Sequence, residues 1–127
     1  MSNAYNSTDY NPPIPILSIR FGYGDRQPWL GPYDAIVDTG ADATIVPEEI
    51  PLRLRAIPLN PVNLVTQWGE SHPATAYLVH VGIGDIHLAG IVVAGDPTSH
   101  EIILGRNLLN RLALLLDGPQ AEADVLD

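Results

Sequence analysis

Apolar and polar residues alternate along most of the chain between residues 14 and 116, which is the period of a β-strand with one buried face. The leucines of 106–112 are instead spaced three and four residues apart, which predicts a short helix. We therefore expect a mainly β domain with one short helix near its C-terminal end. The predicted strands are 14–21, 33–37, 43–46, 62–66, 74–81, 86–93, 102–104 and 113–116.

The segments between these strands are rich in glycine and proline, which favour turns. Hairpins are expected to turn near 68–71 and 82–85, and 48–61 is predicted to be an irregular, proline-rich connection. In the turn-rich stretch 22–32, Trp29 and Leu30 are expected to pack the loop down onto the domain.

Both ends of the chain are polar. We expect a flexible arm over 1–13, in which 2–4 resemble the remnant of an expression tag, and an acidic flexible tail over 119–127. The folded domain would then occupy 14–118.

Composition narrows the possible partners and chemistry. The chain has 127 residues, enough for one domain with its own core. It has no cysteine, so disulfides and thiolate chemistry are excluded. Its net charge is −9 and all six basic residues are arginines, which disfavours nucleic acid and anionic membranes as partners. The longest apolar stretch, 102–116, is interrupted by polar residues, and no signal peptide is expected, so we predict a cytoplasmic protein.

The segment 35–46, Ala-Ile-Val-Asp-Thr-Gly-Ala-Asp-Ala-Thr-Ile-Val, carries the strongest chemical signal. An apolar strand delivers the carboxylate of Asp38 to its end, and the chain then turns through Thr39 and Gly40 into another strand. Asp, Thr and Gly are all common turn residues, so a turn alone would explain the tripeptide. The apolar residues on both sides argue against a simple turn, because together with the tripeptide they resemble the active-site motif of retroviral aspartic proteases, the retropepsins.

A second segment, 103–109 (Ile-Leu-Gly-Arg-Asn-Leu-Leu), resembles the retropepsin stretch in which a strand threads behind the active-site loop and enters the single helix. The order of the two motifs and the hairpins between them also match. The resemblance extends from about residue 14 to residue 118. It implies a retropepsin-like β-barrel that works as a homodimeric aspartic endopeptidase on peptide or protein substrates, with no cofactor.

The chemistry of this class requires two facing carboxylates that share one proton. At about 3 Å and an effective dielectric near 20, two carboxylates repel by about 5 kcal/mol, so one proton is retained between them. This chain has a single Asp-Thr-Gly, at 38–40, and Asp117-Gly118 lacks the middle residue. The second carboxylate must therefore come from another copy of the chain through a two-fold axis.

The resemblance also implies roles for individual residues. Asp38 is the catalytic acid and base, Thr39 bonds to the partner's backbone, and Gly40 offers its carbonyl to the substrate. Ala41 and Asp42 are expected to line the cleft and bond to the substrate backbone.

Three further residues are expected to support the site. Gly105 belongs to the strand behind the active-site loop, Arg106 would pair with Asp42, and Asn107 would hold the loop. The Arg106 pair would serve either as a structural salt bridge or in substrate binding.

The hairpin near 68–71 lies where retropepsins carry the flap that covers the substrate. Trp68 would act there as an apolar lid or pack on its own hairpin, with Gly69 beside it. Ile14 stands where several retroviral enzymes have an arginine that reaches the partner subunit. Because the flap tip has one glycine and a tryptophan, a catalytically weak or inactive peptide-binding or dimerisation module on the same fold is the alternative function.

His80 and His87 would face each other across the second hairpin if its turn were Ile83-Gly84. Two half-exposed strand residues explain them better than a metal site, because no third ligand has suitable spacing. No metal site is therefore predicted.

Overall fold

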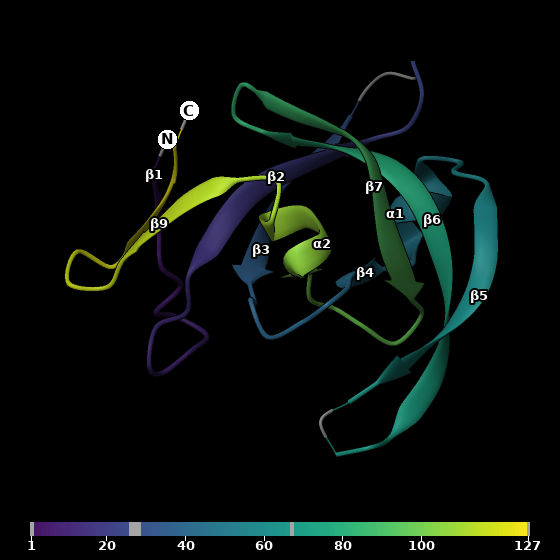
Figure 1. Cartoon of the computed structure of the whole chain (residues 1–127), viewed down its shortest axis with the longest axis horizontal. Coiled ribbons are helices and arrows are strands. Elements are labelled where there is room, and N and C mark those ends of the chain that lie inside the picture. The colour runs from purple at the N-terminus through teal and green to yellow at the C-terminus, as the bar shows by residue number, and fades with distance from the viewer. Residues whose placement is uncertain (1, 26–28, 67, 127) are drawn as a thin grey trace.

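The protein is described by a computed structural model that covers residues 2–25, 29–66 and 68–126. It is mainly β, with one large and one small sheet (Figure 1). The strands of the large sheet run in the order β2-β3-β8-β4-β7-β6-β5, and β2 also pairs with β6. That extra pairing curls the sheet back on itself around an apolar interior. The bounds of these strands are β2 Ile16–Gly22, β3 Leu30–Val37, β4 Thr44–Pro47, β5 Pro58–Val65, β6 Ser71–Ile83, β7 Ile86–Asp96 and β8 Ile103–Leu104.

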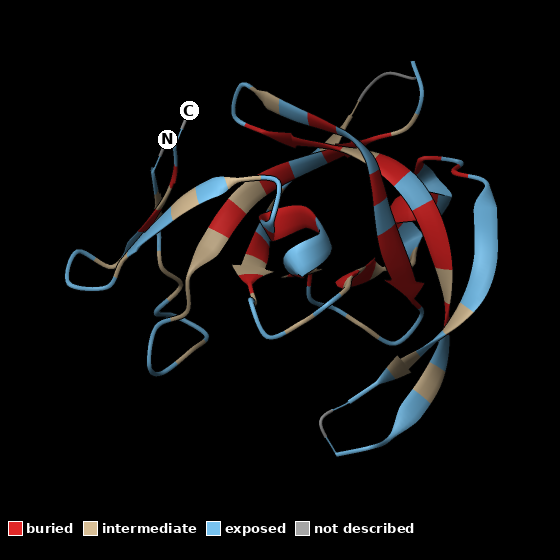
Figure 2. Cartoon of the chain, in the orientation of Figure 1, coloured by how far each residue is buried: buried red, intermediate tan, exposed pale blue. Residues whose placement is uncertain are grey.

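Alternation along the central strands fills that interior. On β2, Leu17, Ile19 and Phe21 are fully buried and the residues between them are not, as the sequence pattern predicts. Val81 on β6 and Leu108 contact the same core. Figure 2 shows buried residues concentrated on β2, β6 and β7, whereas β5 and the tip of the β5–β6 hairpin are exposed. No helix in the described part of the chain is long and apolar enough to cross a lipid bilayer.

The prediction that both ends are irregular is wrong for the segments nearest the termini. Strands β1 Ser2–Ala4, β9 Ala113–Asp117 and β10 Glu122–Leu126 form the small sheet, in the order β1-β10-β9. Ala123 and Val125 are buried on β10, and their burial outweighs the solvation of Asp124, the acidic residue between them. Residues 2–4 are thus part of the fold, because they pair with β10.

Two short helices are present where one was predicted. Helix α1, Glu49–Arg53, lies within the stretch expected to be irregular, and it buries Ile50 and Pro51. A proline in the first helical turn loses no hydrogen bond, because the first backbone N–H groups of a helix have no partner within it. Helix α2, Arg106–Leu109, is present where expected but ends earlier, at a C-cap on Asn110.

Candidate active site

The Asp38 loop begins where β3 ends and is fixed by backbone hydrogen bonds to β8. β3 and β8 are parallel, with Val37 opposite Leu104. The N–H of Ile36 donates to the carbonyl of Ile102 at 2.8 Å, and that of Asp38 donates to Leu104 at 3.1 Å. These hydrogen bonds hold the Asp38 end of β3 against β8, which belongs to the second sequence motif, residues 103–109.

Within the loop, the carboxylate of Asp38 is held by its own backbone. The N–H of Gly40 donates to Asp38 Oδ1 at 3.0 Å, and the N–H of Ala41 donates to the Asp38 carbonyl at 3.2 Å. Asp38 is half-buried while Thr39 and Gly40 are exposed. Thr39 and Gly40 are therefore accessible to a second molecule.

Gly105 lets β8 pass directly behind this loop. A Cβ on Gly105 would lie 2.2 Å from the carbonyl oxygen of Ala43, far inside van der Waals contact. The backbone N–H of the neighbouring Arg106 donates to the Ala41 carbonyl at 2.8 Å. Only glycine permits this approach, which explains its place between the strand and helix α2.

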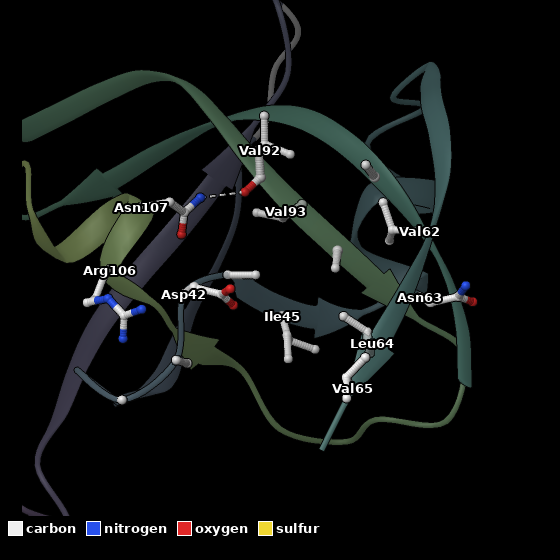
Figure 3. Close-up of a pocket in the computed structure, with 15 residues that line it drawn as sticks. Asp42, Ile45, Val62, Asn63, Leu64, Val65, Val92, Val93, Arg106 and Asn107 are labelled. Atoms are coloured by element: carbon white, nitrogen blue, oxygen red, sulfur yellow. Dashed lines mark hydrogen bonds between the residues drawn. The ribbon is translucent and has the colours of Figure 1, made fainter. Parts of the chain in front are cut away.

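A buried hydroxyl fastens the loop to α2. The side chain of Thr44 is fully buried; its Oγ1 donates to Asn107 Oδ1 at 2.7 Å and accepts from the N–H of Gly105 at 3.1 Å. Asn107 Nδ2 in turn donates to the carbonyl of Val92 on β7 at 2.9 Å (Figure 3). Asn107 therefore links β4, helix α2 and β7 through hydrogen bonds.

Arg106 does not pair with Asp42, the partner that was expected for it. Its Nη1 donates to the carbonyl of Thr39 at 2.8 Å, and within the described residues it forms no ion pair with Asp42. The guanidinium thus contacts the loop through a backbone oxygen, while the carboxylate of Asp42 stays exposed. The expected salt bridge is wrong for this structure, because the loop places the Thr39 carbonyl within reach of the guanidinium.

An open pocket of about 670 Å³ extends from this loop to the β5–β6 hairpin. Gly40, Ala41, Asp42, Arg106 and Asn107 contribute to its lining, but Asp38 and Thr39 do not and lie on the same loop beside it. Figure 3 shows Asp42 and Arg106 on one side of the pocket and the β5 side chains on the other. The lining residues that sequence reasoning missed are Ala43, Ile45, Val62, Asn63, Leu64, Val65, Ala76, Val92, Val93 and Ala94. Alternation identifies their strands, but which face lines a cleft depends on how those strands pair.

The tip of the β5–β6 hairpin stands away from the pocket. Its loop is closed by the N–H of Thr66 donating to Glu70 at 2.8 Å, and Gly69 has a positive φ of 81°. Trp68 is 80% exposed, and neither Trp68 nor Gly69 lines the pocket of this chain. Among the described residues, Trp68 therefore does not cover the pocket.

A second polar cluster ties the start of β6 to the end of β7. His72 Nε2 lies 2.9 Å from Asp96 Oδ2, and Asp96 Oδ1 accepts hydrogen bonds from the N–H and Oγ1 of Thr98, both at 2.9 Å. Burial alone would raise the pKa of Asp96, which is 6% exposed. The hydrogen bonds from Thr98 and His72 outweigh that effect and lower the pKa.

The two histidines of the second hairpin do not face each other. Ile83 pairs with Ile86, so the turn is Gly84-Asp85, and His87 lies opposite Gly82. Instead, the ring of Trp29 lies 6.4 Å from that of His80 and 5.3 Å from that of His87. The prediction that Trp29 packs its loop down is confirmed. In the described residues, no group of three or more His, Asp or Glu side chains could hold a metal ion.

An aspartate loop at the end of a strand, with a glycine-containing strand and a short helix behind it, defines the class of retropepsin-like aspartic proteases. A crystal structure of a retropepsin-like aspartic protease from Rickettsia conorii matches 98% of this chain and 88% of that one, with a TM-score of 0.63 and 17% sequence identity. That similarity establishes the fold.

The chain belongs to the family described as gag-polyprotein putative aspartyl protease, whose family model matches residues 31–111. The matched range contains both the Asp38 loop and the Gly105–Asn107 support. A comparison with curated protein sequences gave no match.

Proposed function

We propose that the protein is an aspartic endopeptidase that works as a homodimer, with one Asp38 from each subunit at a shared catalytic centre. The observation that carries the proposal is the Asp38 loop itself. It is fixed from behind by Gly105 and Thr44, its carboxylate is half-buried, and it adjoins an open cleft. Aspartyl-protease family membership supports the same chemistry.

In this mechanism one carboxylate is ionised and the other protonated. The ionised carboxylate removes a proton from a water molecule, whose oxygen attacks the peptide carbonyl carbon. The protonated one gives its proton to the carbonyl oxygen, which forms a neutral tetrahedral intermediate. When that intermediate collapses, the carboxyl group that took the water proton gives it to the leaving nitrogen and the C–N bond breaks. A hydroxyl proton of the intermediate passes to the other carboxylate, which restores the starting pair, and no covalent enzyme intermediate is formed.

The surrounding residues have proposed roles in this centre. The exposed Thr39 hydroxyl bonds to the partner's loop, and Gly40, Ala41 and Asp42 contact the substrate backbone. Trp68 and Gly69 cover the bound substrate when a second subunit and a peptide are present.

A second copy has an available docking edge. β9 is an edge strand of the small sheet, and Leu115 and Leu116 on it are 48% and 43% exposed. Pairing two β9 strands about a two-fold axis would satisfy their free backbone groups and cover these leucines. This supports the homodimer that the catalytic centre requires.

The test is hydrolysis of unstructured peptides, with products identified by mass spectrometry. We expect pepstatin-sensitive cleavage that is lost in Asp38→Asn and retained in Asp34→Asn, a matched change at an exposed position of β3, the strand that precedes Asp38. The rate per subunit should fall when the protein is diluted below its dimerisation constant. Cleavage that survives Asp38→Asn would overturn the proposal.

A non-catalytic peptide-binding module on the same fold is the second candidate. The observation that favours it is Trp68, which is 80% exposed and outside the pocket lining, so this tryptophan does not cover the cleft of one chain. Tight peptide binding without turnover, unchanged by Asp38→Asn, would favour this function over hydrolysis.

A further inference from the structure

The charged side chains that line the pocket are not equally engaged. Arg106 Nη1 is bonded to the Thr39 carbonyl at 2.8 Å. Asp42 is exposed, and no hydrogen bond or ion pair to its carboxylate is present within residues 2–25, 29–66 and 68–126. Figure 3 shows the Asp42 side chain extending from its loop on the side of the pocket nearest Ile45. An unengaged negative charge therefore stands at the wall of the cleft.

Next to this charge, the pocket is apolar. Ile45 lies between the Asp42 wall and β5, where Val62 and Leu64 line the opposite side (Figure 3). Ala76 and Ala94, opposite each other on β6 and β7, add small side chains to the lining and leave room above them. Such a surface suits an unbranched aliphatic chain several carbons long.

A lysine or arginine side chain matches both features. Its methylene stem covers apolar surface while its charged end remains at the wet rim, next to a carboxylate. The chain as a whole reinforces this preference, since its net charge is −9 and it contains no lysine. The positive charge of Arg106, which also lines the pocket, would repel such a side chain. Its Nη1, however, is directed to the Thr39 carbonyl.

We infer that the pocket selects peptides that place a lysine or arginine side chain against Ile45, with its charged end at the carboxylate of Asp42. Asp42 is then a specificity-determining residue. The inference rests on the proposed function only in that the cleft must bind extended peptides. It requires no turnover.

The experiment measures binding to the Asp38→Asn protein, so that hydrolysis does not consume the ligand. Fluorescently labelled peptides of one neutral sequence carry a single lysine at each position in turn. The matched set carries norleucine, which has the same length of stem without the charge. We expect one position at which lysine binds about twofold to fivefold more tightly than norleucine, as for an exposed charge pair. This ratio should decrease as salt is raised.

Three variants in the same background separate a local contact from general attraction. Asp42→Asn should remove the lysine preference, so that lysine and norleucine peptides bind equally tightly at that position. Asp85→Asn removes the same charge at the exposed β6–β7 turn and should retain the preference. Asp42→Lys should reverse it, so that a glutamate peptide binds more tightly than norleucine. Equal binding of lysine and norleucine at every position, or a preference that survives Asp42→Asn, would overturn the inference.

The wild-type protein distinguishes this inference from the proposed function. If the Asp38→Asn protein shows the lysine preference but the wild type cleaves no peptide, the specificity stands and the hydrolysis does not. If the wild type cleaves lysine and norleucine peptides equally well, the hydrolysis stands and the specificity does not.

Discussion

Replacing Thr44 by valine removes the hydroxyl that joins the active-site loop to α2 and puts a methyl group in its place. Valine fills nearly the same volume, so the side chain still packs. The N–H of Gly105, which is buried, then loses its acceptor at 3.1 Å, and Asn107 Oδ1 loses its donor at 2.7 Å. Asn107 is exposed, so water replaces the second contact. Leaving the buried N–H unpaired costs about 1–3 kcal/mol, and we expect a loss of about 2 kcal/mol.

Urea unfolding at one fixed protein concentration measures this change, because the stability of the proposed dimer would depend on concentration. A loss of about 2 kcal/mol lowers the midpoint by about 1 M. Thr44→Ser, which keeps the hydroxyl and loses a methyl group, should cost about 1 kcal/mol. A double-mutant cycle with Asn107→Ala should give a coupling of about 1 kcal/mol between the two side chains. If Thr44→Val is as stable as the wild type, the hydroxyl does not hold the loop and the reasoning fails.

Three further changes have defined outcomes. Gly105→Ala places a methyl group 2.2 Å from the Ala43 carbonyl oxygen, so we expect it to destabilise the protein by more than about 2 kcal/mol in the same urea assay; a neutral effect would contradict the close packing. The folded-state pKa of Asp96 is lowered, so its contribution to stability is present above the unfolded pKa of about 4 and is lost as pH falls through the folded value. Asp96→Asn should therefore be less stable than the wild type at pH 7, and the gap measured by urea unfolding should narrow below about pH 4; a gap that widens in acid would contradict this sign. A hydrogen bond to Glu101 raises the pKa of Tyr10 to about 12, so tyrosinate absorbance should show a late-titrating component that Tyr10→Phe removes, and an unchanged titration curve would contradict the contact.

The site was more predictable from the sequence than the ends of the chain were. The Asp38 loop and Gly105 could be predicted because each lies in a recognisable sequence motif, namely an apolar strand before the carboxylate and a strand-to-helix junction at the glycine. Strands β1 and β10 of the small sheet were missed because the buried residues Ala123 and Val125 alternate with the acidic residues Glu122 and Asp124, so the tail reads as solvated by composition. Its burial depends on contacts with residues 2–4, which are more than a hundred positions away.

Other differences arise from geometry that residue order does not determine. Helix α1 was missed because Pro51 reads as a helix breaker, although in the first helical turn it costs no hydrogen bond. The positions of His80 and His87 were wrong because the turn falls one residue later than expected and a register shift follows between Val79 and Val81. Arg106 has two acceptors within reach of its long side chain, and only the folded loop decides between them.

The most direct test of the two-carboxylate centre is to mix wild-type protein with Asp38→Asn at constant total concentration and let the subunits exchange. If each active centre needs an Asp38 from both subunits, peptide cleavage should follow the square of the wild-type fraction and fall to about one quarter in an equal mixture. A linear decrease, to about one half, would show that one chain cleaves peptides alone and would contradict the account.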